Sequence, residues 1–351
     1  KRKPANVQYT FNQYDTLYTL AKARNIQLQL SLTGPAPAWA TANHKIGPDK
    51  PNPKYYAEFV NATVSHFRDL IDRYSIWNEP NYVGWLAPLR QGPKIYRSLY
   101  TAGYAAAKAA DPSAQVLIGE TAPYAIRKRE TAPLAFLRGV TCTNRSFAAP
   151  KCPPLKADGY AHHPYDFDHP PTYRYPGRDN ATLATLGNLT GALDKLGQSG
   201  ALTDSAGKPL DVWLTEYGFF GTGHRKTSAK KRGKYLQQAF NIALNNPRVR
   251  EMLQYLLVPP RKPYNFFDTS IADKRGRPTS AFKALAKWAQ AALKSGKVAA
   301  PGQHARSSSS PPPQQSSGGG SGGSGGGGTP PPSSCSVPEL PGGICPTSPL
   351  P

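Results

Sequence analysis

The chain has 351 residues, enough for one large domain, and no apolar run near the roughly 20 residues that a membrane-spanning helix needs. Its 43 Lys and Arg residues against 21 Asp and Glu give a formal net charge of +22, which suits nucleic acid, anionic lipid or acidic polysaccharide as partners. No aromatic residues alternate with the basic run from His224 to Lys234, which disfavours a single-strand nucleic-acid surface. A soluble protein with a basic surface is the simpler interpretation, and association with cell-wall or surface polysaccharide stays open.

Apolar periodicity up to about residue 300 predicts strands that alternate with helices. Asn52 and Pro53 are predicted to begin one helix, as N-cap and first-turn proline. Apolar residues recur at helical spacing in several stretches, among them Ile95, Leu99, Ala102, Ala106, Ala109 and Leu186, Leu189, Leu193, Leu196. Six short apolar runs are predicted strands: Ile26–Leu32, Ser75–Trp77, Val116–Ile118, Gly159–His162, Val212–Thr215 and Met252–Val258. This alternation predicts a parallel sheet, either an open doubly wound sheet or a barrel.

The residues after the last predicted helix have a different composition. Residues 301–334 are rich in Pro, Gly and Ser and predict a disordered linker, because they cannot bury enough apolar surface to fold. Residues 335–351 are too few for a domain and are predicted to be a short tail. The four cysteines fall into two close pairs, Cys142 with Cys152 and Cys335 with Cys345. Two local disulfides are therefore predicted, which favours a secreted, extracellular protein.

Two glutamates each end a predicted strand. Glu79 lies in Ile76-Trp77-Asn78-Glu79-Pro80-Asn81, and Glu216 lies in Val212-Trp213-Leu214-Thr215-Glu216-Tyr217-Gly218. In a parallel α/β barrel all strands point the same way, so carboxylates at the ends of two strands can face each other. Cleavage of a glycosidic bond needs such a pair, one carboxyl to protonate the departing oxygen and one to attack or to activate water.

The Trp-Asn-Glu-Pro motif resembles the acid/base signature of glycoside hydrolase clan A, a barrel clan that includes cellulases, β-mannanases and β-xylosidases. The clan places this motif at the end of the fourth strand and its nucleophile at the end of the seventh. Glu216 ends the third predicted strand after Glu79, which matches that count. The resemblance, over residues 5–294, implies that Glu79 is the acid/base, initially protonated, and that Glu216 is an ionised nucleophile.

The same resemblance implies several substrate-binding residues. Asn78 would hold the sugar 2-hydroxyl, and His163 and Tyr165 would orient the nucleophile and contact the sugar. Trp39, in a proline-rich loop, would stack on a sugar, although packing beneath that loop is an alternative; Trp85 is a weaker candidate. Glu120 also ends a strand, and we expect it to contact ligand or form an ion pair rather than act as a catalyst. Adjacent His162 and His163 point to opposite faces of a strand, which disfavours a metal site, so no metal or organic cofactor is expected.

The expected fold is an α/β, (β/α)8 TIM-barrel type over residues 1–300, without the first two strands. Only about 25 residues precede the first predicted strand, and the chain has no counterpart of the clan's arginine after strand two or of its tryptophan after strand eight. We expect exposed edges on the strands near residues 29 and 255, and poor stability. The predicted function is a retaining O-glycoside hydrolase that cleaves β-glycosidic bonds by double displacement. The alternative is a catalytically inactive barrel that binds glycan.

Overall fold

A computed structural model describes residues 2–125, 128–261 and 266–299 of the chain. Its main element is a parallel sheet of six strands in the order β1-β2-β3-β5-β7-β8. The strands are β1 Gln29–Leu32, β2 Arg73–Ile76, β3 Gln115–Thr121, β5 Gly159–His162, β7 Val212–Tyr217 and β8 Val249–Gln254. A second, two-stranded sheet of β4 Leu155–Lys156 and β6 Leu202–Thr203 was not predicted. The predicted alternation and the parallel sheet are confirmed, but the last strand begins and ends earlier than predicted.

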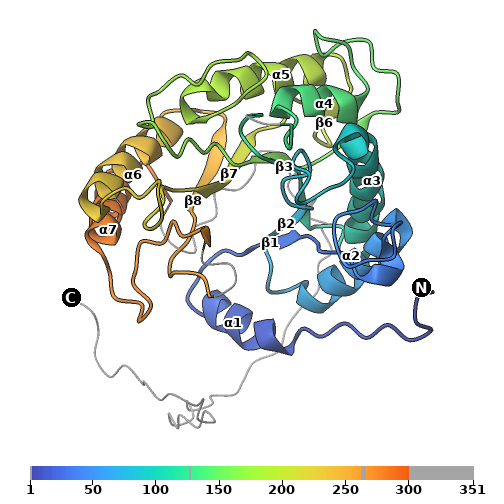
Figure 1. Cartoon of the computed structure of the whole chain (residues 1–351), viewed down its shortest axis with the longest axis horizontal. Coiled ribbons are helices and arrows are strands. Elements are labelled where there is room, and N and C mark those ends of the chain that lie inside the picture. Colours follow the sequence, from blue (N-terminus) through green and yellow to red (C-terminus); the bar gives the residue numbers. More distant parts are fainter. Residues whose placement is uncertain (1, 126–127, 262–265, 300–351) are drawn as a thin grey trace, which may run out of the picture. The chain divides into compact units, whose positions relative to one another are not determined.

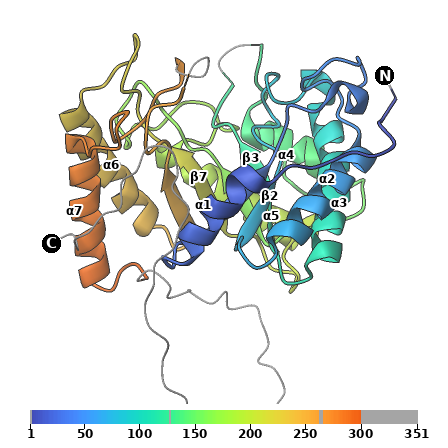
Figure 2. The ribbon, with the colours of Figure 1, turned by 90° about the horizontal axis from the view of Figure 1, so that it is seen from below.

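Helices surround the outer face of the curled sheet (Figure 1). They are α1 Asn12–Lys22, α2 Pro53–Phe67, α3 Gly92–Ala110, α4 Pro133–Thr141, α5 Leu186–Gln198, α6 Ala229–Leu244 and α7 Ser280–Lys294. Short 3-10 turns lie at η1 Ala38–Ala40, η2 Leu89–Gln91 and η3 Leu183–Thr185. Viewed from the side, α6 and α7 lie at one edge of the sheet and α2 and α3 at the other (Figure 2). In the portion of the chain that the structure describes, no helix has the length and apolar character to cross a membrane.

Contacts between strands that are not neighbours show how strongly the sheet curls. Arg73 on β2 forms an ion pair with Glu251 on β8, although β3, β5 and β7 separate these two strands in the sheet order. Thr215 on β7 likewise donates to Glu120 on β3 across the concave face. The sheet is therefore a partial barrel with an interior. Within the described part of the chain, its edge strands β1 and β8 each pair on one side only. The expected barrel-type fold is confirmed, as are the unpaired edges.

Side-chain alternation divides the sheet into an outer and an inner face. Outward residues such as Val116, Tyr160 and Leu214 join the main hydrophobic core with the helices. Inward residues Leu117, Ala161 and Trp213 form a second, separate apolar cluster inside the partial barrel. Since side chains two residues apart share a face, the strands place their next inward residues on top of this cluster, toward their carboxyl ends. The inner cluster therefore forms the floor beneath the inward side chains at the carboxyl ends of the strands.

The sequence predicted the start of α2 and the buried face of α5, but not the buried face of α3. Asn52 caps α2 as predicted, because its side chain accepts hydrogen bonds from the backbone N–H groups of Lys54 and Tyr55. The leucine stripe predicted for α5 is fully buried. The helix predicted from the apolar stripe at Ile95 is confirmed as α3, but Leu99 is the one stripe residue that is fully buried. The buried residues of α3 are Gly92, Tyr96, Leu99, Tyr100, Gly103, Ala107 and Ala110.

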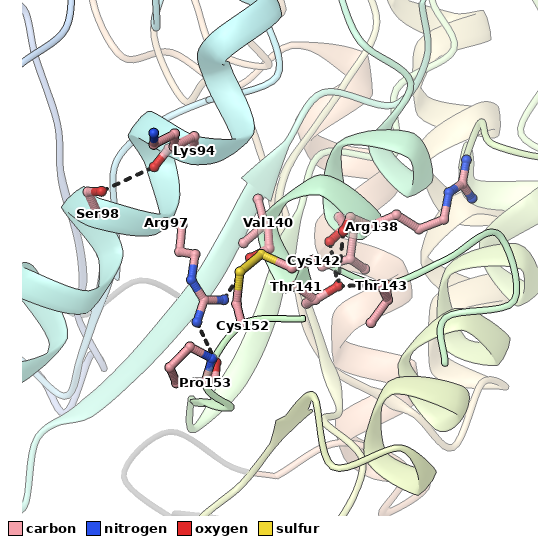
Figure 3. Close-up of a disulfide and its surroundings, with 11 residues drawn as sticks. Lys94, Arg97, Ser98, Arg138, Val140, Thr141, Cys142, Thr143, Cys152 and Pro153 are labelled. Carbon is pink, nitrogen blue, oxygen red and sulfur yellow. Dashed lines mark hydrogen bonds between the residues drawn. A yellow bond between two sulfur atoms is a disulfide. The ribbon is translucent and has the colours of Figure 1, made fainter. Parts of the chain in front are cut away.

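A disulfide joins Cys142, just after α4, to Cys152, as predicted (Figure 3). The Arg97 guanidinium of α3 lies against it and donates hydrogen bonds to the carbonyl oxygens of Val140 and Pro153. The second predicted pair, Cys335 with Cys345, lies outside the described residues, as do the predicted linker 301–334 and tail 335–351.

Candidate active site

Glu79 and Glu216 converge on one imidazole. The Nδ1 atom of His163 lies 3.2 Å from Oε1 of Glu79 and 3.7 Å from Oε2 of Glu216. These two carboxylate oxygens are therefore at most about 7 Å apart. Both glutamate side chains stay partly open to solvent, 19% and 22% exposed, whereas His163 is 1% exposed. The structure thus brings together two accessible carboxylates above a buried histidine.

His163 reaches this position because of strand alternation. Ala161 belongs to the inner apolar cluster, so His163, two residues further along, also points inward. His162 points the other way, where its ring nitrogens contact the Thr121 hydroxyl at 2.9 Å and the Ala181 carbonyl at 2.7 Å. Burial lowers the pKa of His162 to about 4, so it is neutral at physiological pH. The prediction that the two histidines face opposite sides is confirmed.

Glu120 lies beneath the two accessible glutamates and is 1% exposed. Its Oε2 contacts Nε2 of His163 at 2.7 Å, and it also accepts from the Thr215 hydroxyl. The pairing register of β3 shifts between Gly119 and Thr121, and Glu120 has a φ of 47°. Such a bulge changes the direction of a side chain relative to simple alternation. Gly119 is required there, because a Cβ would lie 2.4 Å from the Ala161 carbonyl oxygen.

Tyr165 holds Glu216 from the side. Its hydroxyl donates to Oε2 of Glu216 at 3.0 Å, and its ring stacks on Phe167 and Tyr217. Phe267 contacts the same ring edge-on at 5.9 Å between centroids. The hydroxyl is thus fixed by aromatic packing on several sides, so it can orient one carboxylate oxygen without reorganising.

The charges in this group shift several pKa values. Burial alone would lower the pKa of His163, but the carboxylates of Glu216, Glu120 and Glu79 raise it well above its usual range. Burial raises the pKa of Glu216 from 4.5 to about 7; the charge of His163 opposes this rise, and that of Glu79 adds to it. The resemblance implied that Glu216 is ionised. With a pKa of about 7, Glu216 is instead about half ionised near neutral pH.

The other predicted binding residues lie in different surroundings. Asn78 is 9% exposed and directly precedes Glu79. Trp39 is half-buried in η1. Its ring packs edge-on against that of Tyr55, with 5.2 Å between the ring centroids, and it lies against the hydrophobic core. Trp85 accepts, through its backbone carbonyl, a hydrogen bond from the Trp77 indole. Among the described residues no group of three or more His, Cys, Asp or Glu side chains is arranged to hold a metal ion.

Sequence reasoning missed two residues of the site. Tyr255 follows β8, where a tryptophan was sought and not found; burial, then the charges of Glu216 and Glu79, raise its pKa to about 12. Its aromatic side chain, within the last predicted strand, could have indicated from the sequence that Tyr255 belongs to the site. Asn81 is fully buried, and its amide bonds Ala122 and the Thr131 carbonyl, which fixes the loop after Glu79 against the loop after β3. The sequence spacing could not show that Asn81, rather than Asn78, makes these hydrogen bonds.

A cavity of about 540 Å³ opens among the loops that follow β7 and β8. Thr222, Arg261, Asp268 and Lys274 are among its lining residues. Asp268 follows Phe267, which packs against Tyr165. The cavity therefore lies at the carboxyl ends of the strands, as the glutamates do.

The overall arrangement is shared with solved structures of low sequence identity. A family 39 glycoside hydrolase from the gut symbiont Bacteroides cellulosilyticus WH2 superposes with a TM-score of 0.60 at 16% identity, over 81% of this chain and 54% of that one. A glucosidase from Croceicoccus marinus gives 0.55 at 15% identity, over 80% and 54%. Xylanase 10B from Thermotoga petrophila RKU-1, in complex with xylobiose, gives 0.52 at 16% identity, over 82% and 80%.

The chain has the fold of these glycoside hydrolases. It spans about half the length of the first two. No protein-family model matches the sequence, and no curated protein matches it either. The comparisons therefore support the barrel-type fold.

Proposed function

We propose that the chain is a retaining glycoside hydrolase that cleaves β-glycosidic bonds of a polysaccharide or oligoglycoside. The observation that carries the proposal is the convergence of Glu79 and Glu216, both accessible, on one nitrogen of a buried histidine. Retaining enzymes separate their two carboxyl groups by about 5–5.5 Å and inverting enzymes by about 6.5–9.5 Å. The upper bound of about 7 Å between one oxygen of each carboxyl admits the retaining separation and also the short end of the inverting range, so the retaining assignment rests on the Trp-Asn-Glu-Pro motif and on the azide experiment below. The glycoside hydrolase fold and the Trp-Asn-Glu-Pro motif support the same assignment.

The reaction follows from the positions of these groups. Glu216 attacks the anomeric carbon while Glu79 gives its proton to the departing glycosidic oxygen, which leaves a covalent glycosyl-enzyme. Tyr165 and His163 hold the attacking carboxylate in place. Esterification removes the negative charge of Glu216, so Glu79 can then take a proton from the water that attacks the intermediate. Asn78, directly before Glu79, and the aromatic ring of Tyr255 are proposed to contact the sugar, with Trp39 a further proposed stacking residue.

The substrate proposal starts from the enzymes that share the fold. One neighbour is a xylanase in complex with xylobiose and another a glucosidase, so aryl β-xylosides and β-glucosides are the first substrates to test. The Cys142–Cys152 disulfide supports a secreted protein, because such bonds persist in oxidising compartments. The net charge of +22 supports association with an acidic cell-wall or surface polysaccharide.

Azide separates the roles of the two glutamates. Both Glu79→Ala and Glu216→Ala are expected to lower kcat/KM on a β-linked oligosaccharide by about a thousandfold or more, since each removes one of the two reacting carboxyl groups and the departing sugar oxygen needs a proton. Azide rescue is measured on an activated aryl β-glycoside. With azide added, Glu79→Ala should form the β-glycosyl azide from the covalent intermediate, whereas Glu216→Ala should form the α-glycosyl azide by direct displacement. The products are distinguished by proton NMR of the anomeric position.

The matched control is Glu58→Ala, which removes a partly exposed glutamate of α2 that pairs with Lys3. It should keep wild-type turnover. Full activity in either active-site variant would overturn the assignment. Glycan binding without turnover on any β-glycoside would instead favour the alternative, a binding barrel.

A further inference from the structure

His163 faces carboxylate oxygens from both of its ring nitrogens. Nε2 lies 2.7 Å from Glu120, and Nδ1 lies 3.2 Å from Glu79 and 3.7 Å from Glu216. A neutral imidazole has one N–H and one lone pair, so one of its nitrogens would turn a lone pair toward a carboxylate. An imidazolium donates from both nitrogens and removes that repulsion. The geometry therefore favours the charged form of the ring.

Glu120 is built as a buried anion. It accepts from the hydroxyls of Thr215 and Ser31 and from the amide of Gln29, and it offers no surface to substrate because it is 1% exposed. Burial alone would raise its pKa, but the hydrogen bonds and charge of its neighbours, His163 first, lower it. A carboxylate that is buried and ionised needs a cation nearby, and the ring of His163 is in direct contact.

We propose that Glu120 is a positioning residue whose negative charge keeps His163 doubly protonated, so that one N–H always faces Glu79 and Glu216. The effect on catalysis rests on the proposed hydrolase function. The charge state of His163 does not, and it can be measured without any substrate.

The balance of charges around His163 predicts the direction of the effect. The titratable groups that face it from the surrounding elements are Glu79, Glu120, Glu216, Tyr165 and the neighbouring His162. Glu120→Gln removes one negative charge, and the ring is then expected to lose its proton. Glu216 would lose the positive charge of His163, which lowers its pKa more than the charge of Glu120 raises it, so its ionised form would become less favourable.

Histidine ring NMR on the full chain tests the charge directly. With 15N-labelled histidine, and with His163→Gln to assign the signal, wild-type His163 should be doubly protonated at pH 7 and pH 8. In Glu120→Gln it should be neutral at pH 8. Glu120→Asp keeps the charge, and Thr215→Val removes only a hydrogen bond to it, so both should keep the ring protonated. If Glu120→Gln does not fold, the wild-type titration and Glu120→Asp still decide.

A neutral His163 in the wild type at pH 7, or a ring in Glu120→Gln that stays protonated like the wild type, would overturn the proposal. In kinetics, the acidic limb of the kcat/KM profile should move up by about one pH unit in Glu120→Gln and stay in place in Thr215→Val. A downward shift would mean that the ring kept its charge, and would also overturn it. Absence of turnover in the wild type would count against the hydrolase alone, because the NMR result stands by itself.

Discussion

Glu216 holds a negative charge where burial and two other carboxylates oppose it. Its pKa in the folded chain, about 7, lies above its ordinary value of 4.5. A raised pKa means that the folded state binds the proton more tightly than the unfolded state. The stability that this proton contributes is fully present below about pH 4.5 and is lost as pH rises through about 7. The ionised form of Glu216 therefore costs the folded state stability above about pH 7.

Glu216→Gln removes that cost, and we expect the variant to be more stable than the wild type above neutral pH. Its Tm should be higher by on the order of 5 °C at pH 8 and nearly equal at pH 4, measured by calorimetry at both values. Glu58→Gln, at a partly exposed position on α2, is the control and should show no such dependence on pH. Equal Tm values of wild type and Glu216→Gln at pH 8 would contradict the prediction.

Helix α3 shows why an element's existence is easier to predict than its buried face. The apolar count favoured Ile95, Leu99 and their partners; Leu99 is fully buried and Ile95 partly, and the helix also buries Tyr96 and Tyr100. The Tyr96 hydroxyl lies between the Ile76 carbonyl and the Gly119 N–H, and the Tyr100 hydroxyl donates to the Lys156 carbonyl. Because these hydroxyls find backbone partners, the rings can be buried at little polar cost. Those partners come from distant strands, so the helix sequence could not reveal them.

The loop closed by Cys142 and Cys152 is an element with its own expected contribution to stability. The two cysteines are 10 residues apart, and a loop of this size is expected to contribute about 2–3 kcal/mol by restricting the unfolded chain. The double variant Cys142→Ser/Cys152→Ser should lose that amount in urea unfolding. Its turnover should be unchanged, because α4 runs back from the carboxyl ends of the strands and the disulfide follows its far end.

Equal free energies of unfolding for the oxidised wild type and the double variant would mean that contacts such as those of Arg97 already fix the loop. Reduction of the wild type with dithiothreitol is the matched control and should reproduce the loss seen in the variant.

At the scale of the whole partial barrel, several of the exposed large apolar side chains lie near the edges of the sheet. The edge strands β1 and β8 are less buried than the strands between them. Large apolar side chains are exposed on α1 and on or after β8: Tyr14, Leu17, Leu20, Leu253, Leu257 and Val258. Exposed edges and apolar patches promote association with other chains. This feature agrees with the poor stability expected from the sequence, which stays a prediction.

We therefore expect the chain to self-associate as its concentration rises, measured by sedimentation velocity. Leu17→Lys combined with Leu253→Lys should shift the protein toward monomer, because it places charge on both regions. Ile46→Lys is the control: Ile46 is 73% exposed but lies in the loop between β1 and α2. A wild type that stays monomeric at high concentration would contradict the prediction.

The sequence by itself determined the alternation of strands and helices, the cap at Asn52, the Cys142–Cys152 pair and the glutamates at two strand ends. These features depend on residues close together in the chain, so periodicity and spacing reveal them. Only the tertiary structure decided that His163 contacts all three carboxylates and that Glu120 points inward. Those positions depend on the curl of the sheet and on a bulge beside Gly119, which arise from pairing between strands distant in sequence. The high pKa of Glu216 was likewise beyond the sequence, because it is produced by burial and by charges on other strands.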